Sequence, residues 1–96
     1  MNDIIKHGKE VIRIEASAIA DLEQSINGDF VNAVETILNS TGRVVFTGMG
    51  KSGLIARKIV ATLNSTGTAA IFLHPTDALH GDLGMVRSED DVILIS

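Results

Sequence analysis

The sequence is organised around a glycine-rich hexapeptide, Gly48-Met49-Gly50-Lys51-Ser52-Gly53. The apolar run before it, residues 43–47, has the β-branched composition of a buried strand. The segment after it, residues 54–63, has the length and composition of a helix. Glycines let a backbone approach an anion closely, and the first turn of a helix presents N–H groups without internal partners. This order predicts a site for a phosphorylated ligand, at which Gly48 and Gly50 allow close approach.

Two better-known phosphate loops fit the hexapeptide less well. A P-loop needs a glycine five residues before the glycine of Gly-Lys-Ser, and Val45 stands there. The spacing of the glycines does match the dinucleotide fingerprint, which is a weak signal on its own. The acidic residue that should end the second strand is absent, because Leu73-His74 occupies that place and Asp77 comes too late. A purely structural glycine turn is a further alternative, and the pattern favours phosphate or sugar-phosphate binding over all three.

Composition excludes several other classes of function. The chain has 96 residues, a net charge of −4 and 45% apolar residues, which suits one small domain with a core. Three Phe and no Trp or Tyr leave no stacking platform for single-stranded nucleic acid, and the acidic segment 1–42 is unsuited to reading DNA. The absence of cysteine excludes disulfides and thiolate metal sites. No stretch resembles a signal peptide or a membrane-spanning helix, so we expect a soluble, cytoplasmic protein without membrane or nucleic-acid partners.

The order of predicted elements is that of an α/β protein. Apolar periodicity and turn residues predict helices at 3–26, 30–40 and 52–64, strands at 43–47, 68–73 and 91–96, and a helical turn followed by a loop within 76–86. Asn27-Gly28 is expected to end the first helix and Asp29 to cap the second. Apolar strands joined by helices predict a parallel sheet, in a three-layer αβα fold with flavodoxin-like order.

The sequence predicts different structures for the two ends of the chain. Residues 1–42 should form a segment of two helices. Residues 43–96 should form the first half of a larger α/β domain, or a sheet that a partner completes, since no helix follows the last strand. The apolar stripe of the first helix could cover the sheet, or it could also pack against another subunit. In doubly wound sheets, ligands bind beyond the carboxyl ends of the strands, commonly between strands one and three. The glycine loop and Ser96 are therefore expected at one site.

Four segments of the chain closely resemble the arabinose 5-phosphate isomerases, which are sugar isomerase (SIS) domain enzymes of the Kdo branch of lipopolysaccharide synthesis. They are Thr47–Gly53, Ala61–Thr68, His74-Pro75 and His80–Met85. The resemblance covers nearly the whole chain. It implies interconversion of D-ribulose 5-phosphate and D-arabinose 5-phosphate through an enediol, in a homotetramer without a cofactor.

The resemblance also implies roles for individual residues. Lys51 matches an active-site lysine that serves the phosphate or the enediolate oxygen, and His80 matches a histidine of the site. Ser52 and Ser96 match positions in two phosphate loops. The acid and base candidates of the family lie beyond residue 96, so this segment alone is expected to be inactive, and CBS domains that often follow in the family are not visible here.

Several other residues are better explained by a structural role or by exposure to solvent than by a role in a site. His74, Asp77, His80 and Asp82 could form a metal cluster, but a histidine before proline is more often a turn residue, and we expect no metal. Asp82 is expected to orient His80. His7, Arg57 and Lys58 are expected to face solvent. The alternatives for function are a non-catalytic sugar-phosphate sensor and a different SIS isomerase such as a phosphoheptose isomerase.

Overall fold

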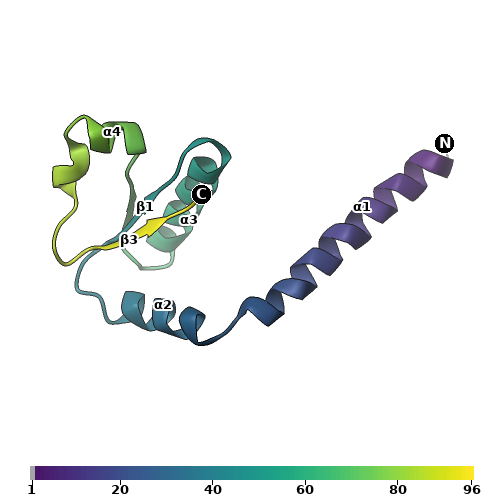
Figure 1. Ribbon diagram of the computed structural model, residues 1–96, viewed down its shortest axis with the longest axis horizontal. Coiled ribbons are helices and arrows are strands. Elements are labelled where there is room, and N and C mark those ends of the chain that lie inside the picture. Colours follow the sequence, from purple (N-terminus) through teal and green to yellow (C-terminus); the bar gives the residue numbers. More distant parts are fainter. Residues whose placement is uncertain (1) are drawn as a thin grey trace. The chain divides into compact units, whose positions relative to one another are not determined.

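The computed structural model describes residues 2–96, apart from the side chain of Asp82, so the expected role of that carboxylate lies outside the described residues. The predicted order of helices and strands is confirmed (Figure 1). The elements are α1 (Asn2–Asp21), η1 (Leu22–Ser25), α2 (Gly28–Leu38), β1 (Val44–Thr47), α3 (Gly50–Ser65), β2 (Ala70–Phe72), α4 (Pro75–Leu79), η2 (Asp82–Met85) and β3 (Asp91–Leu94).

The chain divides into two compact units, one that ends at Val34 and one that runs from Glu35 to Ser96. The first unit contains helices and no strand among its described residues, and none of the residues of α1 is buried. The second unit holds the three strands. No helix among residues 2–96 is both long enough and apolar enough to cross a membrane.

The sheet has the order β2-β1-β3, and both pairings are parallel. Val45 pairs in register with Ile71 on one side and Val92 on the other, so β1 is the central strand. All three strands therefore end at one edge of the sheet, and the chain crosses from one side of β1 to the other between β2 and β3. This is the switch point at which α/β proteins bind ligands.

Helices cover both faces of the sheet, which confirms the expected three-layer arrangement. The core on one face contains Val44, Phe46, Ala56 and Ala70, and partly buried residues of α3 pack against it. Ile37 of α2 packs against the same cluster. Side chains alternate along a strand, so the buried Val45 faces the opposite side, where α4 and η2 line a cleft with the sheet. The described chain thus holds a short sheet of a doubly wound fold.

The predicted cap of the second helix is wrong by two residues. The Oδ1 of Asn27, not the carboxylate of Asp29, accepts the hydrogen bond at the start of α2, from the N–H of Asp29 at 3.0 Å. Asn and Asp are about equally good N-caps, so the choice depends on where the preceding chain turns. Because the turn follows Ile26, α2 begins at Gly28 and Asp29 falls within its first turn.

Two polar side chains fix the ends of the strands. Asn64 of α3 donates to the carbonyl of Ala70 and accepts from its N–H, both at 2.9 Å, which aligns β2 with the helix before it. Asp90 precedes β3 and accepts from the backbone N–H of Arg43 at 2.8 Å and from its Nη2 at 2.9 Å. These bonds hold the starts of β1 and β3 together.

Candidate functional site

The glycine loop joins the end of β1 to the start of α3 by close backbone packing. A Cβ atom on Gly48 would lie 2.8 Å from the carbonyl oxygen of Ile95, and one on Gly53 would lie 2.7 Å from the carbonyl oxygen of Gly48. Real Cβ atoms do not approach backbone oxygens this closely, so both positions require glycine. The residue after β3 also lies next to the start of the loop, because the N–H of Ile95 donates to the carbonyl of Thr47 at 2.9 Å.

The first turn of α3 is suited to an anion. Helix α3 begins at Gly50, two residues earlier than the sequence predicts, and Gly50 has a φ of +59° that favours glycine. No side chain of the described residues caps this end. The first backbone hydrogen bond of the helix runs from the N–H of Gly53 to the carbonyl of Met49. The N–H groups of Gly50, Lys51 and Ser52 are therefore available to a ligand.

A cleft of about 390 Å³ lies at this edge of the sheet. It brings together three of the predicted site residues: Gly48 at the end of β1, Ser52 in the first turn of α3, and Ser96 after β3. Its remaining lining residues are Thr47, Met49, Pro75, Leu94 and Ile95. The expected convergence of the glycine loop and Ser96 between the first and third strands is therefore present.

The other predicted site residues lie outside the lining of this cleft. Gly50 and Lys51 are exposed in the first turn of α3, on the same turn as Ser52. His80 is exposed at the end of α4, where its backbone N–H donates to the carbonyls of Thr76 and Asp77 at 3.2 and 3.1 Å. Lys51 thus lies on the turn that also carries Ser52, next to the cleft, while His80 is not among the residues that line it.

His74 has a structural role that fits its position before proline. Its Nδ1 accepts a hydrogen bond from the backbone N–H of Thr76 at 3.1 Å and so caps α4. The imidazole ring lies edge-on to Phe72, with ring centroids 6.4 Å apart. No group of three or more metal-ligating side chains occurs among the residues that the structure describes.

The loop that carries His80 is attached to the start of the sheet. The Nη2 of Arg43 donates to the carbonyl of Met85, at the end of η2, at 2.6 Å. The same guanidinium binds Asp90, whose side chain is 1% exposed. The side-chain hydrogen bond from Arg43 and the backbone N–H groups of Arg87 and Arg43 hold the pKa of Asp90 well below its usual range, and this carboxylate raises the pKa of Arg43. Arg43 and Asp90 form a clamp that restrains the end of the loop at Met85.

A second cleft, of about 430 Å³, adjoins the first and shares Thr47, Pro75 and Leu94 with it. Its other lining residues are Leu73, Ala78, Leu79, Leu83, Val86 and Val92. The lining carries no charged group, so this cleft can take apolar groups but cannot neutralise a phosphate.

The sequence analysis missed Thr47 and Pro75, which line both clefts. Thr47 is the last residue of β1, and a polar side chain at the carboxyl end of a parallel strand is a signal that could have identified it. Pro75 gives no such signal, because its position depends on how α4 folds back over the sheet.

Comparison with known proteins places this fold and loop in a family. The SIS domain matches residues 37–96, which is well over half of the chain, so the chain belongs to the SIS domain family. The resemblance to the arabinose 5-phosphate isomerases is also confirmed. The arabinose 5-phosphate isomerase KdsD of Salmonella typhi is 54% identical over 98% of this chain, and the GutQ enzyme of Escherichia coli is 46% identical over 97%.

Solved structures agree with the sequence matches. An Escherichia coli protein in complex with arabinose 5-phosphate is 46% identical, with a TM-score of 0.90 over 99% of this chain. A Bacteroides fragilis protein is 38% identical, with a TM-score of 0.91 over 97% of the chain. The chain spans 29% of the length of these curated relatives and 50% of each of these two solved chains.

Proposed function

We propose that the protein is an aldose–ketose isomerase that interconverts D-arabinose 5-phosphate and D-ribulose 5-phosphate. The observation that carries this proposal is the 54% identity to an arabinose 5-phosphate isomerase across the segment that builds the cleft of Gly48, Ser52 and Ser96. We further propose that the protein acts in the cytoplasm as a homotetramer, in the Kdo branch of lipopolysaccharide synthesis.

The phosphate would bind at the first turn of α3. The free N–H groups of this turn and the partial positive charge of the helix end suit a dianion, and the hydroxyls of Ser52 and Ser96 add donors. The lack of a Cβ at Gly50 leaves the backbone of this turn accessible, whereas at Gly48 it makes room for the carbonyl oxygen of Ile95. A 46% identical relative was solved in complex with arabinose 5-phosphate, which supports a sugar phosphate as the ligand.

The chemistry would proceed on the open-chain sugar through a cis-enediol(ate). A base removes the proton from C2 of the aldose, and the electron pair forms the C1–C2 double bond as the carbonyl oxygen takes up a proton. The C2 hydroxyl then loses its proton to become the new carbonyl, and a proton is added to C1 to give the ketose. A cation near the carbonyl oxygen lowers the barrier because it stabilises the developing negative charge. We propose Lys51 for this role or for the phosphate, and His80 for ring opening or hydroxyl binding. We assign the base to no residue of this chain.

The deciding experiment is an isomerase assay on the complete natural protein. Arabinose 5-phosphate is offered beside ribose, glucose and sedoheptulose phosphates, and selective formation of ribulose 5-phosphate is expected. Equal or better turnover of a heptose phosphate would favour a different SIS isomerase. Absence of turnover together with stabilisation against heat by the sugar phosphate would favour a sensor.

A pair of variants tests the proposed role of Lys51. Lys51→Ala is expected to reduce kcat by at least about a hundredfold, the size of effect seen when an oxyanion donor is removed. Lys58→Ala is the matched control, since Lys58 is also an exposed lysine of α3 but lies two turns further along the helix. Equal activity of the two variants would remove Lys51 from the site.

A further inference from the structure

Helix α4 is too short to hold His80 in place by itself. It has five residues, Pro75–Leu79, and His80 is its C-cap. A helix of this length has no stability of its own in water, because its nucleation is unfavourable and few hydrogen bonds follow. Both ends of the segment must therefore be fixed by the surrounding structure. Arg43 holds the chain beyond His80, at Met85, and His74 holds the start of the helix.

Histidine is not one of the preferred N-cap residues, which are serine, threonine, asparagine and aspartate. The backbone of His74 nevertheless has the extended conformation of an N-cap, with φ −68° and ψ 133°, and its Nδ1 accepts from the N–H of Thr76 at 3.1 Å. An asparagine can accept the same hydrogen bond. Only an aromatic ring, however, also packs edge-on against Phe72 as the imidazole does. His74 thus joins the start of α4 to β2.

Phe72 in turn packs against α3. The guanidinium carbon of Arg57 lies 4.1 Å from the centroid of the Phe72 ring, which is the geometry of a cation–π interaction. A Cβ atom on Gly53 would lie 3.7 Å from Cζ of Phe72, an ordinary contact distance. Arg57 follows Gly53 by four residues, so both contacts come from one face of α3. The ring therefore connects α4 to the helix whose first turn is the proposed phosphate site.

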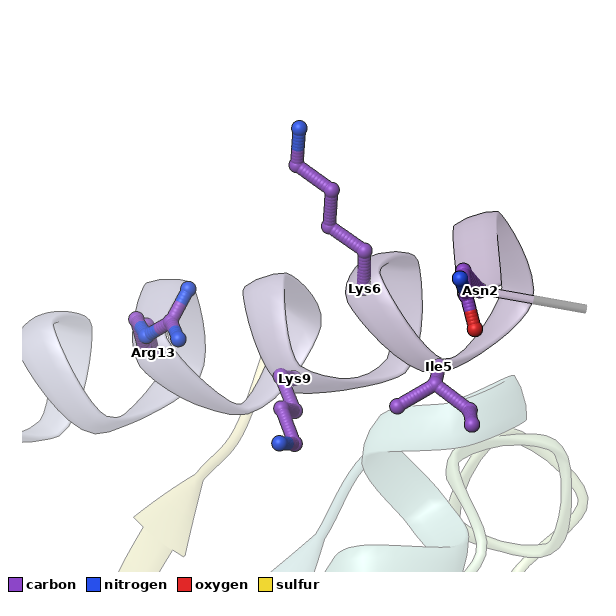
Figure 2. A pocket seen from close by; sticks show the side chains of 5 residues that line it. All are labelled: Asn2, Ile5, Lys6, Lys9 and Arg13. Atoms are coloured by element: carbon purple, nitrogen blue, oxygen red, sulfur yellow. The ribbon is translucent and has the colours of Figure 1, made fainter.

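A shallow depression on α1 is a poorer place for the phosphate than the turn of α3. All of its lining residues come from one helix, and they are Asn2, Ile5, Lys6, Lys9 and Arg13. Figure 2 shows Lys6 and Lys9 projecting from different sides of α1, so their charges do not converge on one point. The turn of α3 therefore remains the proposed phosphate site, and α4 is the element that has to be placed relative to it.

The proposed site depends on this placement because its parts lie on two elements. Ser52 lines the cleft from the first turn of α3, whereas His80 is at the end of α4. At 1.5 Å per residue, His80 lies about 9 Å along the helix from His74. A shift or a rotation at the start of α4 therefore moves His80 relative to the phosphate turn.

We propose that His74 is a positioning residue for His80, and that it acts through a contact with Phe72 that Arg57 supports. The cap on Thr76 fixes the start of α4, and the ring contact fixes this start to β2 and α3. The end of the helix, with His80, is thereby held relative to the phosphate turn. His74 is not among the residues that line either cleft, so we assign it no contact with the substrate. The inference rests on the role proposed for His80 in isomerisation.

The first test compares two variants of His74 in the complete natural protein. His74→Leu removes the hydrogen-bond acceptor, whereas His74→Asn retains one that can cap α4. His74→Leu should lower kcat for arabinose 5-phosphate at least about tenfold, because α4 without its cap is displaced for much of the time. His74→Asn should recover most of this loss. The inhibition constant of inorganic phosphate, a probe of the turn of α3, should stay within about twofold in both variants.

Two outcomes of this comparison would overturn the proposal. One is an equal kcat in the two His74 variants, whether both are lowered or both are near the wild type. The other is a loss of phosphate inhibition in parallel with kcat, because His74 would then support the fold of the whole unit and not the position of His80.

Arg57→Gln tests the contact with Phe72 without a change in α4. It should lower kcat about two- to fivefold, the range that a cation–π interaction implies. Lys58→Gln is the matched control. Lys58 is the next residue of α3, is exposed like Arg57, and has no cation–π contact among the residues that the structure describes. It should leave kcat unchanged, and equal kcat values in the two variants would overturn the part assigned to Arg57.

A double variant decides whether His74 acts through His80. If it does, adding His74→Leu to a protein that already carries His80→Ala should change kcat by less than about twofold. Losses that multiply would show that His74 influences the reaction by another route, and they would overturn the proposal. Full activity of His80→Ala would overturn it as well, because α4 would then position no side chain that the reaction needs.

Amide hydrogen exchange tests the anchoring of α4 independently of isomerase activity. The N–H of His80 donates to the carbonyls of Thr76 and Asp77, so its exchange reports on the helix directly. Exchange of residues 76–80 should accelerate in His74→Leu and remain near the wild-type rate in His74→Asn. Unchanged exchange in both variants would overturn the positioning role even in an active isomerase. A protein without isomerase activity that shows the expected exchange would overturn the proposed function, while His74 would still anchor α4.

Discussion

The two units of this chain bury apolar side chains in opposite ways. In the unit from Glu35 to Ser96, a few small and branched residues are almost fully buried, and Val45 has no exposed surface. In the unit that ends at Val34, residues just as apolar, such as Ile12 and Ile19, are 68% exposed. Only the second unit, with its sheet, therefore has a core of buried apolar side chains among the described residues, whereas the helices of the first unit have none.

The largest expected effect tests whether the core alone holds the second unit together. Phe46 lies in the central strand and is 4% exposed. Phe46→Ala should lower the free energy of unfolding by about 3–5 kcal/mol, from lost transfer energy and the cavity left behind. Ile14→Ala, at an exposed position, should change it by less than about 0.5 kcal/mol. Because the chain has no Trp or Tyr, far-ultraviolet circular dichroism in urea is the suitable probe. Similar losses in the two variants would contradict the comparison.

Glycine-to-alanine changes should differ in sign between the two units. Gly53→Ala places a Cβ 2.7 Å from the carbonyl oxygen of Gly48, and the shift that relieves this contact should cost about 1–3 kcal/mol. A Cβ on Gly8 meets no atom of the described residues within 4 Å. Gly8→Ala should therefore stabilise α1 by about 1 kcal/mol, the difference in helix propensity.

Amide hydrogen exchange can localise the two effects. Exchange in α1 should slow in Gly8→Ala, whereas exchange in β1 and α3 should accelerate in Gly53→Ala. Destabilisation of α1 by Gly8→Ala would mean that a neighbour approaches this face closely.

Gly50 allows binding to be separated from folding. Its φ of +59° is a conformation that costs most residues about 1–2 kcal/mol and β-branched residues more. The structure places no atom within 4 Å of a Cβ at Gly50, so the fold loses stability through this φ alone, while a ligand at the first turn of α3 meets the new side chain. Gly50→Val should lower stability and sugar-phosphate affinity together.

Gly50→Asn is the matched comparison, because asparagine tolerates a positive φ. It should lower the affinity for the sugar phosphate, measured by calorimetry on the complete protein, with little change in the melting temperature. Normal affinity in both variants would show that this turn does not bind the phosphate.

The sequence was most informative where one local pattern determines the structure. The apolar strand, the glycine turn and the helix after it are each specified by neighbouring residues. That Ser52 and Ser96 line one cleft follows from the predicted parallel sheet, because parallel strands end at a common edge. It was least informative where two residues compete for one role or where the chain folds back. Asn27 and Asp29 are about equally good caps, and Pro75 reaches the cleft only because α4 returns over the sheet.

The smallest expected effect appears only in acid and concerns the clamp between Arg43 and Asp90. Hydrogen bonds from Arg43 and from the backbone N–H of Arg87 hold the pKa of Asp90 well below its usual value in the folded protein. A carboxylate with a depressed folded-state pKa contributes stability that is fully present above the unfolded pKa, near about 4, and is lost as the pH falls toward the folded value. Unfolding free energy should therefore fall below about pH 4 in the wild type and fall less in Asp90→Asn.

Arg43→Gln serves as the partner variant for this clamp, because it removes the guanidinium and leaves the carboxylate in place. Its acid profile should flatten in the same way as that of Asp90→Asn, since the pKa of Asp90 then rises toward its usual value. Arg43→Gln removes the donor that binds the carbonyl of Met85, and Asp90→Asn removes the carboxylate that orients this donor. Amide hydrogen exchange in the loop of His80 should therefore accelerate in both variants, while exchange in α1 is unaffected. An unchanged acid profile in both variants would mean that other carboxylates determine the acid stability of this unit.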